Sequence, residues 1–181
     1  TDVSVAGGYA YVVGVYHGLH VIDVDTPSDP FEVGSHETPG TASGVAVSAG
    51  HVYIADGDAG LRVVDVSDPS APVEVAFFDT PGEALDVAVA GDFALVADCH
   101  ADLRVIDISS PSSPTEVGSF ETPGCTSGVA ASGGLFRHHH GAAHLPGRAG
   151  DRGGDVGGLH EDDLGWPPVA LLDLVVGGGS G

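Results

Sequence analysis

The amino-acid sequence predicts an all-β protein built from a repeated four-stranded unit. Three observations lead to this prediction: a segment that recurs every 42 residues, short β-branched runs within each period, and no 3.6-residue apolar periodicity before residue 137. The 181 residues suit a single domain, and the apolar content of 42% argues against a disordered chain.

The repeat is visible in three copies that begin at Gly18, Gly60 and Asp102. These copies are GLHVIDVDTPSDPFEVGSHETPG, GLRVVDVSDPSAPVEVAFFDTPG and DLRVIDISSPSSPTEVGSFETPG. A second half-unit has the same period and occurs as VSVAGGYAYVVGVYH, GVAVSAGHVYIADGDA and DVAVAGDFALVADCHA. Self-similarity at a period near 40 residues is typical of propellers and solenoids.

Each period contains four expected strands separated by turn residues. In the middle repeat these strands are residues 45–48, 52–55, 61–66 and 73–78. Proline recurs ahead of the fourth strand as Pro30, Pro72 and Pro114, where it suits a turn or a strand start and would break a helix. Four strands in about 40 residues match one blade of a β-propeller. We therefore predict four-stranded antiparallel propeller blades in an incomplete ring. A solenoid of short coils is the alternative.

The third strand and the turn after it carry a family resemblance. The runs LHVIDVDTPSDP, LRVVDVSDPSAP and LRVIDISSPSSP, each followed by Glu-Val and then Thr-Pro-Gly, resemble the LVIVD repeat. The resemblance implies a β-propeller and a location at the surface of a bacterial or archaeal cell, or secretion. It implies no reaction and provides no catalytic residues.

The repeat stops near Arg137, so we assign residues 1–136 to a propeller segment of about three blades. Residues 137–181 form a tail rich in Gly and His, and two interpretations stay open: a native low-complexity segment, or a region read out of frame. In either case we expect this tail to lack ordered structure. Propellers close with about four to eight blades, so we expect further blades from a longer chain or from other copies.

The net charge of −21, with five Arg and no Lys, disfavours binding to nucleic acids or anionic membranes. No run of 18 apolar residues is present, so we expect no membrane insertion of this segment. The expected partners are other blades and a surface protein or glycan.

The candidate ligand-binding residues lie in the loops between the second and third strands of two repeats. They are Asp56, Asp58, Asp98, His100 and Asp102. Calcium is an alternative occupant because Asp-rich loops supply its oxygen ligands, but these loops lack the full D-x-D-x-D-G spacing. Asp and Gly also suit plain turns, so we expect no cofactor.

The tail contains a second candidate metal site, formed by His138, His139, His140 and His144. Neutral imidazole binds zinc or nickel. A structural zinc site takes four ligands in fixed geometry, which a Gly-rich tract does not impose. We therefore expect no metal there.

Cys99 and Cys125 are the two cysteines of the chain. Cys99 lies in a loop between second and third strands, and Cys125 lies in a link between blades, so both occur at the same end of a blade. A disulfide between them would suit an extracellular protein. Neither position is Cys in the other repeats, which favours two free thiols.

Carboxylates that recur once per blade point to a structural role rather than to catalysis. Asp23, Asp65 and Asp107 share one repeat position, and Glu32, Glu74 and Glu116 share another. An enzyme site is normally one asymmetric set, and G-x-S-x-G and G-x-x-x-x-G-K-[ST] motifs are absent. We therefore expect a non-enzymatic binding or adhesion scaffold. The alternative is a fragment of a hydrolase or lactonase-like propeller enzyme whose active site lies in other blades.

Overall fold

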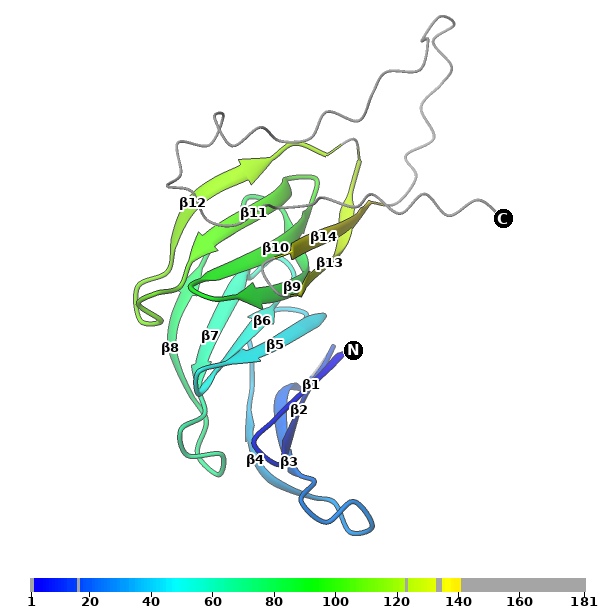
Figure 1. The fold of residues 1–181 in the computed structure, drawn as a ribbon, viewed down its shortest axis with the longest axis vertical. Helices are drawn as coiled ribbons and strands as arrows, with labels where there is room; N and C mark the ends of the chain where they lie inside the picture. The colour runs from blue at the N-terminus through cyan, green and yellow to red at the C-terminus, as the bar shows by residue number, and fades with distance from the viewer. Residues whose placement is uncertain (1, 16, 123, 133–134, 141–181) are drawn as a thin grey trace, which may run out of the picture.

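The computed structural model describes residues 2–15, 17–122, 124–132 and 135–140. Over these residues the chain forms three four-stranded antiparallel sheets and one two-stranded sheet (Figure 1). The strands of each four-stranded sheet lie in sequence order, so each sheet is a simple meander. This result confirms the predicted all-β class and the four-stranded repeat.

Each sheet occupies one period of the sequence and is called a blade below. Blade 1 contains β1 (Asp2–Ala6), β2 (Tyr9–Gly14), β3 (Gly18–Asp23) and β4 (Phe31–His36). Blade 2 contains β5 (Gly44–Ser48), β6 (His51–Ala55), β7 (Leu61–Asp65) and β8 (Val73–Phe78). Blade 3 contains β9 (Glu83–Ala90), β10 (Phe93–Cys99), β11 (Asp102–Asp107) and β12 (Thr115–Phe120). The two-stranded sheet contains β13 (Thr126–Ser132) and β14 (Leu135–His140).

The strand boundaries follow local sequence signals. Pro30, Pro72 and Pro114 stand directly before β4, β8 and β12. At this position proline, which has no amide hydrogen, removes no hydrogen bond from the sheet. The turn between β1 and β2 contains Gly7 and Gly8, both at positive φ, which suits a tight hairpin. The sequence therefore predicts the strands of the middle blade to within one residue at each end.

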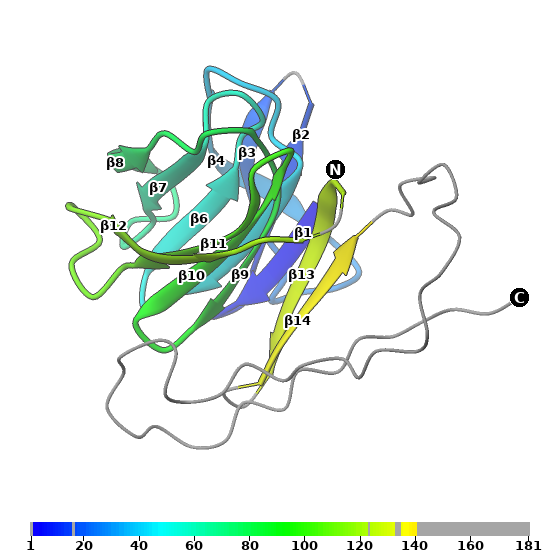
Figure 2. The same ribbon diagram turned by 90° about the horizontal axis from the view of Figure 1, so that it is seen from above.

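The blades follow one another along the long axis of the molecule (Figure 1). Their first strands, β1, β5, β9 and β13, contact one another in succession. The fourth strands, β4, β8 and β12, lie on the opposite side in Figure 1, and Figure 2 shows the same stack from above. This arrangement resembles neighbouring blades of a propeller, whose first strands gather near the axis.

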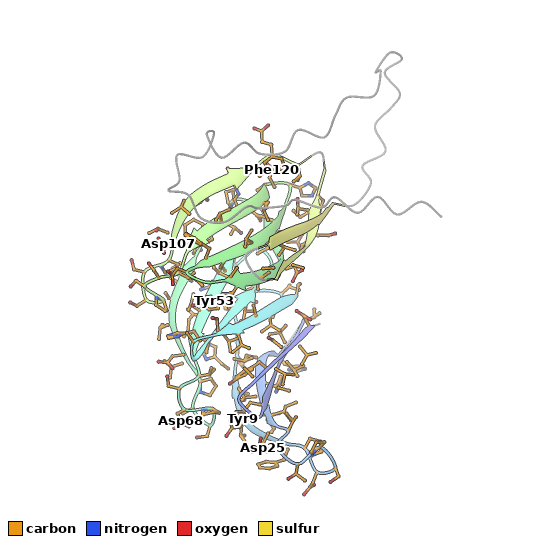
Figure 3. All side chains as sticks on the ribbon, in the orientation of Figure 1. Tyr9, Asp25, Tyr53, Asp68, Asp107 and Phe120 are labelled. Atoms are coloured by element: carbon orange, nitrogen blue, oxygen red, sulfur yellow. A yellow bond between two sulfur atoms is a disulfide. The ribbon has the colours of Figure 1, made fainter. Side chains whose placement is uncertain are left out.

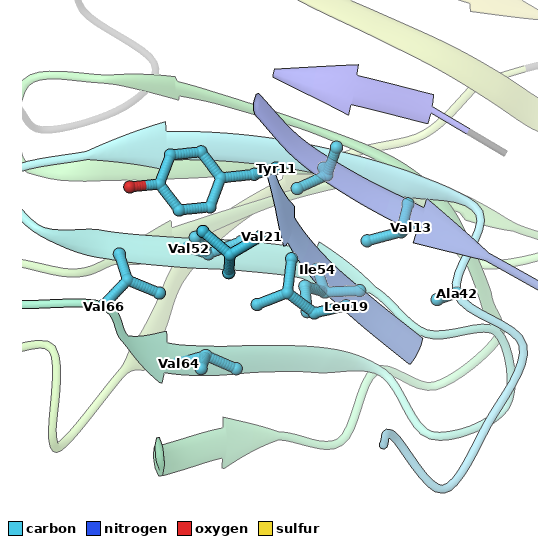
Figure 4. Packing of buried hydrophobic residues seen from close by; sticks show 10 residues of the cluster. Tyr11, Val13, Leu19, Val21, Ala42, Val52, Ile54, Val64 and Val66 are labelled. Atoms are coloured by element: carbon cyan, nitrogen blue, oxygen red, sulfur yellow. The ribbon is translucent and has the colours of Figure 1, made fainter. Parts of the chain in front are cut away.

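Apolar side chains fill the junctions between blades. Between blades 1 and 2, Tyr11, Val13, Leu19 and Val21 on β2 and β3 pack against Val45, Val52, Ile54, Val64 and Val66 of blade 2 (Figure 4). The junction between blades 2 and 3 repeats this pattern one period later, with Tyr53, Ala55, Leu61 and Val63 against Val87, Ala94, Val96, Ile106 and Ile108. Each blade therefore has a trailing face, which covers the next blade, and a leading face, which the preceding blade covers.

Cys99 and Cys125 form a disulfide. This pairing corrects our expectation of two free thiols. Cys99 is the last residue of β10, and Cys125 directly precedes β13, so the bond ties blade 3 to the strand that follows it. The two residues occur at the same end of the blade, as their repeat positions predict, and that proximity allows the bond.

The predicted boundary at Arg137 falls within β14, which extends to His140. The rest of the predicted tail, residues 141–181, lies outside the described residues. The division of the chain at residue 137 therefore stays a prediction.

Candidate ligand-binding loop end

The five candidate ligand residues lie at one end of blades 2 and 3. Asp56 and Asp58 lie in the β6–β7 connection and His100 lies in the β10–β11 connection, whereas Asp98 and Asp102 lie in the adjoining ends of β10 and β11. The links from β4 to β5 and from β8 to β9 pass the same end of the sheets. We call this region the loop end. Its residues differ in exposure, since Asp58 and His100 are exposed whereas Asp56 and Asp98 are fully buried.

Asp56 holds the link between blades 1 and 2 in place. Its carboxylate accepts hydrogen bonds from Thr38 Oγ1 at 2.7 Å and from the Gly40 amide at 2.8 Å. The Arg62 guanidinium lies 3.8 Å from Asp56 Oδ2, and it also contacts Glu74 and the ring of Phe77. A buried carboxylate needs such partners, because an unpaired charge in the interior is costly. The side chain of Asp56 is therefore committed to internal contacts.

Asp98 is the counterpart of Asp56 in blade 3 and has fewer partners. It accepts a hydrogen bond from the Gly82 amide at 3.0 Å and lies 3.7 Å from Arg104 Nε. Asp98 Oδ1 and Thr80 Oγ1 are both buried without a hydrogen-bond partner among the described residues. Burial raises the pKa of Asp98, against the lowering effects of the Gly82 amide, of the nearby Thr80 side chain and of Arg104. Asp98 is thus the less stabilised of the two buried acids.

Asp102 replaces a glycine of the other repeats. Gly18 and Gly60 have φ values of +65° and +73°, and a Cβ at Gly60 would collide with the carbonyl oxygen of Phe78. Asp102 keeps this backbone conformation with a φ of +75°, which Asp tolerates better than most residues. Its Oδ1 accepts hydrogen bonds from Thr122, at 3.0 Å from the amide nitrogen and 3.4 Å from Oγ1.

A hollow of about 410 Å³ opens at the loop end beside the exposed Asp58. Its lining residues are Pro39, Gly40, Thr41, Asp58, Ala59 and Glu83. Glu83 is exposed and begins β9, so acidic residues of blade 2 and blade 3 line one hollow. The sequence analysis missed Thr41 and Glu83, although they share one repeat position with Cys125 and the period could have indicated them.

The backbone next to this hollow is held by a β-bridge between blades 2 and 3. The Gly57 amide donates to the Ala84 carbonyl and the Ala84 amide donates to the Gly57 carbonyl, both at 3.0 Å. Together with the buried Asp56, this bridge fixes the positions of the two walls. Ligand binding by the five predicted residues stays a prediction. Of these five, Asp58 and His100 are exposed to solvent.

The recurring carboxylates serve structural roles, as expected. Asp23, Asp65 and Asp107 each accept a hydrogen bond from the backbone amide two residues later. Figure 3 labels Asp107 together with Asp25 and Asp68 at or just after the ends of third strands. Glu32, Glu74 and Glu116 contact His20, Arg62 and Arg104 of the neighbouring strands.

Within the described part of the chain, His, Cys, Asp and Glu side chains form no group of three or more that could hold a metal ion. The predicted histidine cluster lies elsewhere: His138, His139 and His140 end β14, where side chains are not described, and His144 is outside the described residues. The described residues also contain no helix that could cross a membrane.

Three successive meander sheets of one repeated unit, packed face to face, define a β-propeller-like repeat protein. The chain belongs to the LVIVD repeat family, whose repeat matches residues 1–38, 39–80 and 81–122. Each match contains one of the three blades. The family resemblance stated from the sequence is thereby confirmed.

One similar solved structure is "The crystal structure of a functionally unknown protein from Desulfotomaculum acetoxidans DSM 771", with a TM-score of 0.56 and 18% sequence identity. The match covers 72% of this chain and 45% of that chain, so this chain spans less than half of that protein's length. At this identity the likeness shows the fold alone. No curated protein matches the chain.

Proposed function

We propose that this chain is a non-enzymatic propeller segment of a surface or secreted protein, and that it acts as a binding or adhesion scaffold. The observation that carries the proposal is the hollow at the loop end, where Asp58 of blade 2 and Glu83 of blade 3 line one concave surface. Concave sites with a few converging polar groups are the usual places where proteins bind ligands.

The ligand should present hydrogen-bond donors or positive charge. Carboxylates accept hydrogen bonds from sugar hydroxyls and pair with basic side chains, so a glycan or a basic segment of a surface protein fits this hollow. The net charge of −21 favours such donors over polyanions. The neighbouring buried contacts of Asp56 hold the walls in place, so little conformational entropy is lost on binding.

The disulfide supports a secreted or surface location. Disulfides persist in oxidising compartments and are rare in the cytosol of most organisms. The Cys99–Cys125 bond joins blade 3 to β13, where it would stabilise the segment outside the cell. The resemblance of the repeats to the LVIVD family also implies this location.

The test is a binding measurement on the full chain and on a variant that carries both Asp58→Ala and Glu83→Ala. Immobilised oligosaccharides and lysine-rich peptides serve as probes, with and without calcium. We expect the double variant to lose at least about tenfold in affinity for any probe that the full chain binds. The matched control is Asp29→Ala, which removes an exposed carboxylate from the β3–β4 loop at the other end of blade 1. Equal affinities of the wild-type chain and the double variant would overturn the proposed site.

A further inference from the structure

The outer edge of blade 2 carries exposed apolar side chains along β8. This strand ends its sheet, so among the described residues no strand pairs with its outer edge, which runs along the outside of the stack (Figure 1). Val73, Val75 and Phe77 are 58%, 37% and 53% exposed. An open edge with apolar side chains is a template on which another strand can pair, and proteins usually protect such edges. The edge of β8 is therefore suited to bind a partner.

The repeat does not account for the ring of Phe77. Ser35 and Ser119 stand in its place in β4 and β12, and Thr115 stands in the place of Val73 in β12. A fourth strand therefore folds with hydroxyl side chains at these exposed positions. The two apolar side chains of β8 add contact surface that the packing of a blade does not need.

The two faces of this edge differ in chemistry. On the leading face, Phe77 lies opposite Arg62 of β7, and Glu74 contacts the same guanidinium at 3.4 Å. The guanidinium carbon lies 4.8 Å from the centre of the Phe77 ring, and this cation–π contact holds the ring in place. On the trailing face, Val73 lies opposite Asp65. A strand added to this edge would meet Phe77 and Glu74 with one set of alternate side chains and Val73 with the other set.

Charge determines which kind of strand fits this edge. The exposed Asp68 lies in the β7–β8 connection, and the exposed Asp79 directly follows β8. The chain contains no Lys, and Arg62 and Arg104 each contact carboxylates of their own blade. The net charge of −21 makes a second copy of the chain repulsive and a basic partner attractive. A basic strand is therefore favoured over self-association.

We propose that the outer edge of blade 2 is the docking site for an extended segment of another protein in which apolar residues alternate with Lys or Arg. The segment adds to β8 as a fifth strand, so that its apolar side chains cover Val73 and its basic side chains contact Phe77 and Glu74. A register shift at Val75 interrupts the ladder, so side chains provide more of the affinity than a long run of backbone pairs. The site lies on a different surface from the loop end and does not depend on a ligand there.

The probe is a short peptide with blocked ends in which Val alternates with Lys, titrated into the full chain by calorimetry. The test variant carries Val73→Thr and Phe77→Ser. These changes install the residues that Thr115 and Ser119 provide in β12, so the variant should keep the fold. We expect its affinity for the peptide to fall at least about tenfold, because aromatic anchors dominate contacts of this kind. Bound peptide should also slow hydrogen exchange in β8 and not in β12, since strand addition protects the backbone that it pairs with.

The reciprocal variant carries Thr115→Val and Ser119→Phe, which transfers the two side chains to blade 3. Arg104 occupies the place of Arg62 there and contacts Glu116 in the same way, so this variant should bind a second peptide per chain. Two control peptides alternate Ser with Lys and Val with Glu. Both should bind more weakly than the Val–Lys peptide, because the first lacks apolar contacts and the second is repelled by the acidic chain.

The proposed function and this proposal can fail separately. The variant with Asp58→Ala and Glu83→Ala should bind the Val–Lys peptide as tightly as wild type, whatever the loop end binds. Loss of peptide binding in that variant would place the peptide in the hollow and overturn the present proposal.

Further results would also overturn it. They are no binding of the Val–Lys peptide, equal affinity of the Ser–Lys peptide, unchanged exchange in β8, and equal affinities of wild type and the variant with Val73→Thr and Phe77→Ser. A reciprocal variant that still binds a single peptide would show that these side chains do not define the site. A dimeric wild-type chain that becomes monomeric with Val73→Thr and Phe77→Ser would assign the edge to a second copy of the chain.

Discussion

The junction between blades 2 and 3 and the junction between blade 3 and β13 occupy equivalent places in the repeat but are held by different chemistry. At the first, paired backbone hydrogen bonds join Gly57 to Ala84 above a large apolar cluster. At the second, Cys99 replaces Gly57 in the repeat and bonds covalently to Cys125. The buried apolar cluster there is smaller among the described residues: Leu95, Ala97, Leu103 and Val129. Among the described residues, the disulfide therefore occurs at the junction with the smaller apolar cluster, and the backbone bridge occurs at the junction with the larger one.

The largest expected effect comes from truncating the apolar cluster between blades 2 and 3. Leu61→Ala should destabilise the protein by about 2–5 kcal/mol, because Leu61 is fully buried and its loss leaves a cavity. Leu103→Ala alters the same repeat position at the other junction, where the side chain is 6% exposed, and should cost less. Urea unfolding with the disulfide intact measures both free energies. Equal losses would contradict the proposed difference between the junctions.

Removing the disulfide should have the next largest effect. The bond spans a sequence separation of 26 residues, and its loss through a double Cys99→Ser and Cys125→Ser change should cost about 2–4 kcal/mol. Hydrogen exchange should accelerate at Val129 in β13 and stay slow at Val87 in β9, because the latter junction keeps its own bridge. Wild-type protein treated with a reductant should behave like the double variant. Faster exchange at both sites would mean that the bond stabilises the whole array rather than one junction.

The same comparison shows which parts of the fold the sequence could predict. Each strand of blade 2 is bounded by Gly, Pro, Asp or Ser, and its period recurs, so local signals suffice to place β5 to β8. The fate of Cys99 and Cys125 could not be predicted in this way. Each cysteine occurs in a single repeat, so the period gives no indication of the pairing. The bond depends on how closely the end of β10 and the segment before β13 approach each other in space.

For the candidate site, sequence reasoning placed the candidate residues at one end of the blades but did not indicate which of them are exposed. Asp56 and Asp58 stand two positions apart, yet one is buried beneath Thr38 and Gly40 while the other is exposed beside the hollow. Glu83 reaches the hollow from the following blade, so no motif within one loop could reveal it. Burial and contacts between blades are tertiary properties, which a pattern of residue types does not specify.

A smaller effect should follow from the raised pKa of the buried Asp98. Because the pKa of Asp98 is raised above its unfolded value of 3.8, folded protein binds the proton more tightly than unfolded protein. Its contribution to stability is therefore fully present below pH 3.8 and is lost as the pH rises through the folded pKa. Asp98→Asn removes this dependence, so the stability of the variant relative to wild type should increase as the pH rises above 3.8. Urea unfolding at a series of pH values measures this trend, and a constant difference would contradict it.

The smallest expected effect concerns the turn after β7, and its pH dependence has the opposite sign. Hydrogen bonds from Ser67, first from its side chain and then from its backbone, lower the pKa of Asp65 below 3.8. The resulting stability is present above pH 3.8 and is lost as the pH falls through the lower folded pKa. Asp65→Ala should therefore destabilise the protein slightly near neutral pH and have less effect in acid. Ser67→Ala keeps the backbone donor, at 2.7 Å from Asp65 Oδ1, and should show a smaller change in the same direction. If Asp65→Ala cost the same in acid as at neutral pH, the turn would be stabilised by the shape of the side chain rather than by its charge.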